Sequence, residues 1–385
     1  MKLALCLEYP IGQFGGTEAL VKELLRGLAG KHELVLVSAD TPATLAQSGW
    51  KDVLAAHIPH RPDQIGREAA AQLANRINGL GVQLAHFHLG GNFGWGNRFP
   101  GHCPIPHLNH LGIPCLSTVH SVGPILDGFC GPQRSTALKL AMLPLAWAGK
   151  LQQLRHVRIE IAVSQHDVDK MRSWYWPLRS RYTQIYHSRL HHDSTAPVPN
   201  PREDLILNVG HIAWRKGQVY LAEAFAQIAA RYPTWKLMLA GHRGDESEDR
   251  IRAIAQTHGL EQRILLVGQR DDALALMHRA AIYVQPSNYE ALGLALQEAM
   301  YCGTACIGTC VGGIPELLAG TEMGLLVEPR NVSQLAAALE QLLANPALRQ
   351  KLGRAAAASI VARGMTAEAM LEQYLRLYDS FARKH

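Results

Sequence analysis

Residues 286–300, PSNYEALGLALQEAM, join the end of an apolar run to a helical pattern. Two glutamates in this stretch, Glu290 and Glu298, are separated by seven residues. A helix that begins near Leu292 and ends before Gly303 leaves Glu290 in the loop at the positive end of the helix and places Glu298 on its second turn. Backbone amides and the helix dipole at such a start attract anions. A diphosphate bound there would present its sugar to one carboxylate and its ribose to the other. From the spacing alone, two solvated helix charges are the simpler interpretation.

The surrounding chain alternates short apolar runs with helical patterns, which is typical of parallel sheets covered by helices. At 385 residues it is long enough for two domains. The polar stretch 191–201, HHDSTAPVPNP, holds three prolines and marks the linker. We therefore expect an α/β protein with two doubly wound domains that face each other across a cleft. The expected strands are 3–7, 33–38, 84–88, 113–119 and 159–163, followed by 205–209, 237–240, 264–267, 282–285, 305–307 and 324–327.

Two helices are predicted near the ends of the chain. The first runs from Thr17, a candidate N-cap, to Gly30, with leucines at every fourth position. The glycines before it, Gly15 and Gly16, either bind an anion through free backbone amides or form a plain tight turn. The last segment, 366–384, carries a single apolar stripe and therefore needs an apolar surface to dock on.

Another glycine-flanked stretch, residues 208–217, NVGHIAWRKG, precedes the glutamate motif. Together with GGIPE at 312–316, these segments resemble the signature of family 4 of the retaining glycosyltransferases, and the resemblance covers most of the second half. In the first half it thins to GGTE at 15–18, STVH at 117–120 and AVS at 162–164. The resemblance implies the GT-B fold, built from two Rossmann-like domains. Its parts would be an acceptor-side domain 1–190, a linker 191–203, a nucleotide-sugar-binding domain 204–363, and a helix 364–385 that crosses back to the first domain.

The resemblance also implies roles for single residues. Lys216 and Arg215 would neutralise the donor diphosphate. Glu290 would hold the transferred sugar, Glu298 the ribose, and His120 would lie beside the sugar. The implied catalytic residues are His120, Glu290 and Lys216, and the implied donor-binding residues are Gly15, Gly16, His211, Arg215, Lys216, Glu290, Ala291, Leu292, Gly293, Leu294 and Glu298.

Two positions depart from the family pattern. His211 stands where the family usually has arginine, so phosphate binding would rest on Arg215 and Lys216 or on protonation of this imidazole. Residues 186–189, YHSR, lack the usual Asn-Gly turn, which leaves the end of the first domain open.

The implied function is a retaining, metal-independent glycosyltransferase that moves a sugar from a nucleoside diphosphate sugar to a glycan, lipid or small-molecule acceptor without a cofactor. A nucleotide-sugar epimerase or hydrolase on the same fold is the alternative. Neither a Gly-x-Gly-x-x-Gly fingerprint nor a Gly-Lys-Ser/Thr phosphate loop is present, which disfavours nicotinamide enzymes and P-loop ATPases. A third alternative is a protein that binds a nucleotide sugar without catalysis, but such a protein would have no need to keep the proposed catalytic side chains together with the binding ones. The sequence does not identify the donor base, the sugar, the acceptor or the oligomeric state.

The charge distribution bears on partners and location. The net charge is +6, and residues 1–200 hold all of the excess, with 19 Lys and Arg against 13 Asp and Glu. Such a basic half favours an anionic membrane surface or a phosphorylated acceptor, or is only a solvated face. We expect no nucleic-acid partner. The seven cysteines form no Cys-x-x-Cys pair, and no apolar run is long enough to span a membrane. These features predict a cytoplasmic protein, with or without peripheral contact at the inner face of the membrane.

Three further features of the first half have two interpretations each. The loop 89–103, LGGNFGWGNRFPGHC, suits either acceptor sugars or plain surface packing. The apolar stretch 137–151 is either a membrane-interface helix or a core helix kinked at Pro144, with Leu138, Met142 and Leu145 facing inward. The histidines and the cysteine between 86 and 110 lack the spacing of metal ligands, so we do not expect a metal site.

Overall fold

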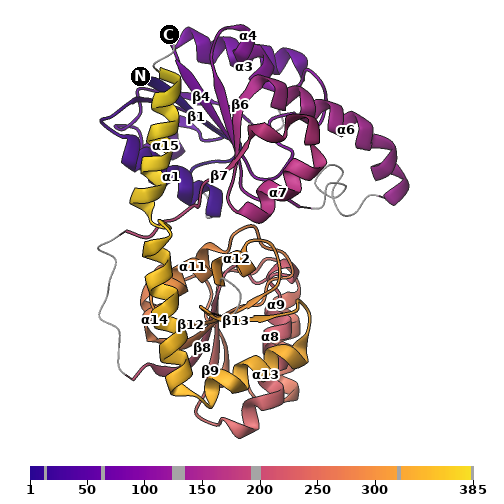
Figure 1. Cartoon of the computed structure of the whole chain (residues 1–385), viewed down its shortest axis with the longest axis vertical. Coiled ribbons are helices and arrows are strands. Elements are labelled where there is room, and N and C mark those ends of the chain that lie inside the picture. Colours follow the sequence, from indigo (N-terminus) through magenta and orange to yellow (C-terminus); the bar gives the residue numbers. More distant parts are fainter. Residues whose placement is uncertain (13–14, 62–65, 124–134, 192–200, 319–321, 383–385) are drawn as a thin grey trace. The chain divides into compact units, whose positions relative to one another are not determined.

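The computed structural model describes residues 1–12, 15–61, 66–123, 135–191, 201–318 and 322–382. Its contacts divide the chain into two compact units (Figure 1). Unit 1 contains Met1–Arg189 and Ala367–His385, and unit 2 contains Leu190–Thr366. The chain therefore enters unit 1 twice, at its beginning and at its end.

Unit 1 is built on a seven-stranded parallel sheet. Its strands are β1 (Lys2–Leu7), β2 (Glu33–Ser38), β3 (Ala56–Pro59), β4 (Leu84–Leu89), β5 (Cys115–Val119), β6 (Val157–Ala162) and β7 (Tyr182–Gln184), in the order β3-β2-β1-β4-β5-β6-β7. The order reverses between β1 and β4, since the strands that follow β1 extend to one side and those from β4 onward to the other. Both β4 and β5 are buried along their whole length, as expected for a parallel sheet with helices on both faces.

The helices of unit 1 cover both faces of this sheet. They are α1 (Gly16–Leu28), α2 (Pro42–Gln47), α3 (Arg67–Gly79), α4 (Pro104–His110), α6 (Thr136–His156), α7 (Gln165–Trp174) and α15 (Ala367–Ala382), with a 3₁₀ turn at Trp176–Arg181. Alternate residues of β1 enter two apolar clusters: Ala4 and Cys6 belong to the cluster that includes α3 and α4, whereas Leu3 and Leu5 belong to the cluster that includes α1 and α15. This alternation is the two-residue period of a strand.

The terminal helix α15 is an integral part of unit 1. Met370, Tyr374 and Tyr378 of its apolar stripe are buried and join the cluster that includes α1. The helix lies beside α1 (Figure 1). Leu371 occupies the space in front of Gly27, where a side chain on α1 would collide with it. The sequence predicted the stripe, and the structure adds the surface that it needs.

Unit 2 repeats the plan with a six-stranded parallel sheet. The strands are β8 (Glu203–Val209), β9 (Lys236–Ala240), β10 (Ile264–Leu266), β11 (Ala280–Gln285), β12 (Ala305–Thr309) and β13 (Leu325–Val327), in the order β10-β9-β8-β11-β12-β13. The helices are α8 (Gln218–Ile228), α9 (Ser247–Thr257), α10 (Ala273–Arg279), α11 (Leu294–Tyr301), α12 (Ile314–Leu318), α13 (Val332–Leu343) and α14 (Pro346–Ala362), with 3₁₀ turns at Trp214–Lys216 and Ala229–Arg231. Here the strand order reverses between β8 and β11.

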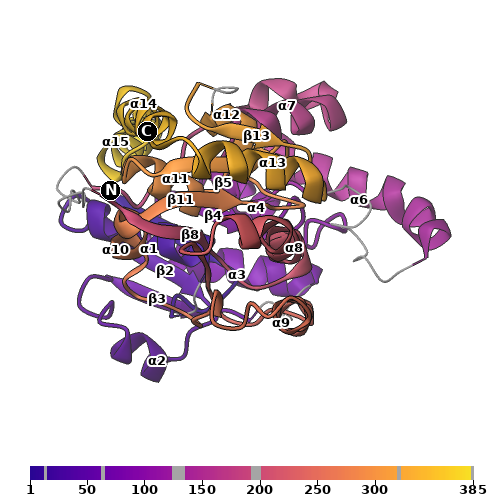
Figure 2. The same cartoon turned by 90° about the horizontal axis from the view of Figure 1, so that it is seen from below.

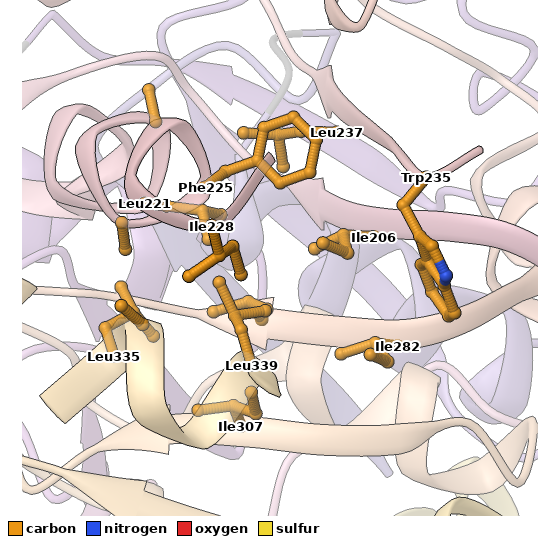
Figure 3. Close-up of a cluster of buried hydrophobic side chains, with 14 of the residues drawn as sticks. Ile206, Leu221, Phe225, Ile228, Trp235, Leu237, Ile282, Ile307, Leu335 and Leu339 are labelled. Carbon is orange, nitrogen blue, oxygen red and sulfur yellow. The ribbon is translucent and has the colours of Figure 1, made fainter. Parts of the chain in front are cut away.

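One core of unit 2 lies between the sheet and the helices α8 and α13. Phe225 of α8, Leu339 of α13 and Ile282 of β11 all belong to this core (Figure 3). All three are fully buried. The prediction of two doubly wound α/β domains is confirmed.

Several local predictions need correction. The sequence did not predict β3 or β7, because each is short and only partly apolar. Thr17 is not the N-cap of α1: the helix begins at Gly16, and Gly15 caps it without a side-chain hydrogen bond. In the predicted linker 191–203, residues 192–200 lie outside the described residues, and Glu203 already begins β8. Residues 383 and 384 of the predicted terminal helix also lie outside them.

The inward face predicted for α6 is wrong. Leu138 and Leu145 are 41% and 43% exposed, and both views show the N-terminal half of the helix extending away from the sheet of unit 1 (Figures 1 and 2). The helix instead buries Lys150, whose Nζ lies 2.8 Å from Oε1 of Glu160, and Gln153, whose Nε2 donates to Oε2 of Glu160 at 2.8 Å. Because a buried carboxylate needs partners, this polar pairing selects the inward face of the C-terminal half.

The glycine-rich loop 89–103 is packed. Trp95 and Phe93 are 4% and 7% exposed. The Trp95 indole donates to the carbonyl oxygen of His88 at 3.1 Å, and its ring stacks on His60. The packing interpretation is therefore correct for these two rings, since neither presents a free face to a sugar.

Candidate functional site

The predicted donor residues of the second half gather at one edge of the unit 2 sheet. Ligands of doubly wound folds bind outside the carboxyl ends of the strands, at the point where the strand order reverses. In unit 2 these ends are Val209 of β8 and Gln285 of β11, and the two strands are neighbours in the sheet. The two segments that follow them, 210–217 and 286–293, are the motifs singled out in the sequence.

Lys216 and Glu290 form an ion pair at this edge. The Lys216 ammonium lies 2.7 Å from Oε2 of Glu290, and the two side chains are 16% and 9% exposed. The same oxygen accepts hydrogen bonds from Gln285 Nε2 and Ser287 Oγ, each at 3.1 Å. Among the residues that the structure describes, the donors to this carboxylate all engage Oε2, so Oε1 can accept from a ligand.

The sequence did not assign roles to Gln285 and Ser287. Gln285 is the last residue of β11 and is 1% exposed, and its side chain also accepts a hydrogen bond from the Tyr283 hydroxyl at 2.8 Å. A buried glutamine at the carboxyl end of a strand next to the reversal was the available signal, because buried amides are retained only where they are hydrogen-bonded.

The ionisation of Glu290 is governed by its cations. Burial alone raises the pKa of this carboxyl, but the nearby charge and hydrogen bond of Lys216, with Arg215 and Ser287, hold the pKa below its ordinary value. Glu290 is therefore an anion at neutral pH, and it can accept hydrogen bonds from hydroxyl groups.

The start of α11 lies directly beside this pair. Gly293 is its N-cap, with φ 97° in the left-handed region and no side chain to cap the first amides. Ala291 and Leu292 are buried, and the Ala291 carbonyl accepts from the Gly313 amide at 2.9 Å. The uncapped amides of the first turn, from Leu294 onward, can therefore serve an anion.

His211, Arg215 and Glu298 complete the predicted donor set of unit 2. His211 lies two residues after the end of β8 and is exposed. Glu298 lies one turn after Leu294 on the same face of α11 and is 5% exposed. The carbonyl of Arg215 accepts from the amides of Asn288 and Tyr289, at 2.9 and 3.2 Å, so backbone hydrogen bonds join the two motif segments, while the Arg215 side chain stays exposed.

The remaining predicted residues, His120, Gly15 and Gly16, belong to unit 1. His120 follows β5, and its Nε2 lies 3.1 Å from Nδ1 of His88. Burial lowers the pKa of His120 to about 3, so the imidazole is neutral at physiological pH. Its ring also packs on His187, whose Nε2 is 2.9 Å from the Tyr374 hydroxyl of α15.

Gly15 and Gly16 stand at the start of α1. The carboxylate of Glu18, which is 7% exposed, already occupies the space in front of Gly15. A side chain at position 15 would therefore collide with this carboxylate, and no side chain caps the start of α1. Among the described residues, no group of three His, Cys, Asp or Glu side chains is arranged to hold a metal ion.

Two family profiles match consecutive parts of the chain. Residues 14–188 match the profile described as Glycosyltransferase Family 4, and residues 193–359 match the profile described as Glycosyl transferases group 1. The chain belongs to the family 4 glycosyltransferases. This membership covers both units and confirms the resemblance that the two motifs of the second half indicate.

Curated relatives match parts of this family 4 chain. The glycogen synthase of Mycobacterium tuberculosis is 31% identical over 199 residues, which are 51% of this chain and 43% of that protein. The D-inositol 3-phosphate glycosyltransferase of Gordonia bronchialis is 26% identical over 324 residues, 78% of this chain and 67% of that protein. The chain thus spans less than half the length of the first of these relatives.

Solved structures share the fold. A glycosyltransferase from Rickettsia africae superposes with a TM-score of 0.78 at 18% identity, covering 100% of this chain and 99% of that one. Anabaena HepE, solved in complex with UDP and glucose, gives 0.74 at 17% identity, covering 99% of this chain and 100% of that one. The GT-B fold is confirmed. Within the described parts of the chain, no helix combines the length and the apolar character that crossing a membrane requires.

Proposed function

We propose that this chain transfers a sugar from a nucleoside diphosphate sugar to an acceptor hydroxyl, with retention of the anomeric configuration. The observation that carries the proposal is the half-buried ion pair of Lys216 and Glu290 beside the uncapped start of α11. A diphosphate at this edge would meet a lysine, the exposed Arg215 and backbone amides. That HepE was solved with UDP and glucose supports this class of donor.

The chemistry of the proposed step is electrostatic. As the bond between the sugar and the phosphate oxygen breaks, negative charge grows on the leaving diphosphate, and Lys216 and Arg215 would stabilise it. Glu290 would accept hydrogen bonds from the hydroxyls of the sugar and so fix its position. Retention would follow from attack on the same face, with the leaving phosphate accepting the proton of the acceptor hydroxyl.

The other assigned residues would orient the donor. Glu298 would accept from the ribose hydroxyls, and the neutral His120 would contact the transferred sugar by hydrogen bonding, because its low pKa rules out a proton donor of imidazolium type at neutral pH. Gly15 and Gly16 would contribute backbone amides at the start of α1, which no side chain caps.

The test is a screen of UDP-, GDP- and ADP-sugars for release of the nucleoside diphosphate, with glycan, lipid-linked and small-molecule acceptors. We expect one donor class to turn over and the product to keep the anomeric configuration of the donor. Release without a glycosylated product would favour a hydrolase, and an isomerised nucleotide sugar would favour an epimerase. An inverted linkage would overturn the retaining mechanism.

A peripheral contact with a membrane is the second part of the proposal. Leu138, Leu140 and Leu145 of α6 are 41%, 54% and 43% exposed, and the sequence of this helix holds no Asp or Glu. An exposed apolar helix surface on a basic half of the chain fits the interface of an anionic bilayer. An acceptor linked to a lipid would then be reached at the bilayer surface.

A further inference from the structure

Two histidines at the donor edge of unit 2 lie in contact with each other. His211 follows β8 and His242 follows β9, and their ring centroids are 3.8 Å apart with an interplanar angle of 52°. Both side chains are exposed. Neither the position of His242 in the sequence nor its spacing from the donor motifs indicated such a partner.

The backbone fixes this contact. The Gly210 amide donates to the Ala240 carbonyl and the Ile212 amide to the His242 carbonyl, each at 2.9 Å. Gly241 lies so close to the Gly210 carbonyl that no side chain could be accommodated there. The two imidazoles are therefore held together by the ends of two neighbouring strands.

The surroundings of the imidazoles are cationic. Burial lowers the pKa of His211, and the neighbouring His242, Lys216 and Arg215 lower it further. Charged groups on the adjoining segments are engaged with other partners. Arg243 pairs with Asp249, the Asp245 carboxylate accepts from the Trp214 amide at 2.7 Å, and Glu290 is bound to Lys216.

We propose that His211 and His242 together bind the diphosphate of the donor and take up a proton from solvent when it binds. The inference rests on the proposed function, because it requires a nucleoside diphosphate at this edge. Without an anion, a proton on His211 is disfavoured by burial, by the neighbouring ring and by two cations. A diphosphate reverses this balance, since it adds negative charge beside the rings and accepts their N–H groups.

Proton uptake makes donor affinity depend on pH. If one proton is taken up in full, Kd rises by up to about tenfold for each unit of increasing pH. Under this proposal the imidazole pKa is higher in the donor-bound state than in the free state. Donor affinity is therefore greatest at low pH and falls as the pH rises through the pKa of the bound state. A free nucleoside diphosphate has a terminal phosphate that titrates near pH 6, so the matching nucleotide sugar, whose phosphates are diesters, is the cleaner probe.

The experiment is isothermal titration calorimetry of the full chain. UDP, GDP and ADP are screened first, and the sugar diester of the tightest binder is titrated at pH 6 to 8 in buffers of different ionisation enthalpy. We expect uptake of about 0.3 to 1 proton in the wild type, as a linked imidazole gives. His211→Arg should bind with a Kd that is nearly independent of pH, because the charge is then permanent. His242→Asn should at least halve the uptake.

His258→Asn is the matched control, since His258 is exposed in unit 2 at the C-terminal end of α9. This variant should keep the uptake of the wild type. Equal uptake in all variants, or none in the wild type, would refute the role of the imidazoles while leaving the donor site standing. Failure of all three nucleotides to bind would refute the donor site itself.

Discussion

Replacement of Lys216 by alanine should destabilise the chain in a way that depends on pH. The change leaves the Glu290 carboxylate, 9% exposed, without its cation. Breaking a buried ion pair from one side typically costs about 3 to 5 kcal/mol. Here Gln285 and Ser287 still donate to the carboxylate and the lysine is partly exposed, so we expect about 2 to 3 kcal/mol at pH 7.

The effect should be visible in thermal unfolding. For a domain of this size, 1 kcal/mol corresponds to roughly 2 to 4 °C, so the Tm of unit 2 should fall by about 4 to 12 °C at pH 7. In the wild type the pKa of Glu290 is held below 4.5, so the pair stabilises above that pH and the contribution is lost as the pH falls. In Lys216→Ala burial is opposed only by Arg215 and the remaining hydrogen bonds, so the pKa of Glu290 should be higher than in the wild type. Lowering the pH then protonates the Glu290 carboxylate of the variant, so the difference in Tm between the wild type and Lys216→Ala should shrink toward pH 4.5.

The assay is differential scanning calorimetry of the wild type, Lys216→Ala, Glu290→Gln and the double variant between pH 4.5 and 8. Glu290→Gln in the Lys216→Ala background removes the uncompensated charge and keeps a hydrogen-bonding side chain, so it should recover most of the lost stability. A difference in Tm that is the same at every pH would refute the reasoning. So would a double variant no more stable than Lys216→Ala.

Four more predictions concern the activity of variants, turnover without added metal, membrane binding and stability at acid pH. Lys216→Ala should lower kcat/KM by roughly 10- to 1000-fold, whereas Glu298→Ala should chiefly raise the donor KM. If the initial rates of a folded Lys216→Ala variant stayed within about twofold of the wild type, the phosphate would have to bind at another place. Turnover should survive a chelator, because cationic side chains do the electrostatic work; loss that magnesium or manganese restores would contradict this. Flotation with anionic vesicles should weaken as the salt concentration rises and should be lower in Leu140→Asp than in the wild type. Equal flotation of the two proteins would exclude α6 as the membrane-binding element. The Tm of unit 1 should fall as the pH drops from about 6.5 toward 5. In this range the histidines of the unfolded chain bind protons, whereas the buried His86 and His120, each with a pKa of about 3, do not. An unchanged Tm over this range would contradict the burial of these rings.

The sequence by itself determined the architecture. Apolar runs placed all six strands of unit 2 and five of the seven of unit 1, because burial on both faces leaves a continuous apolar run that local inspection detects. The motif 286–300 determined that a helix would begin after Glu290, since a glycine followed by a helical pattern is a local signal. Together with residues 208–217 and 312–316, this motif also indicated the family.

Only the tertiary structure decided which side chains meet. Lys216 and Glu290 are separated by 74 residues, and they meet because β8 and β11 are neighbours across the reversal of strand order. His211 and His242 meet because β8 also pairs with β9 on its other side. The exposed leucines of α6 show the same limit: helical spacing fixes which residues share a face, but the buried partner, here Glu160 of another strand, decides which face turns inward. Periodicity is a property of one segment, whereas strand order and buried pairing depend on other elements of the fold.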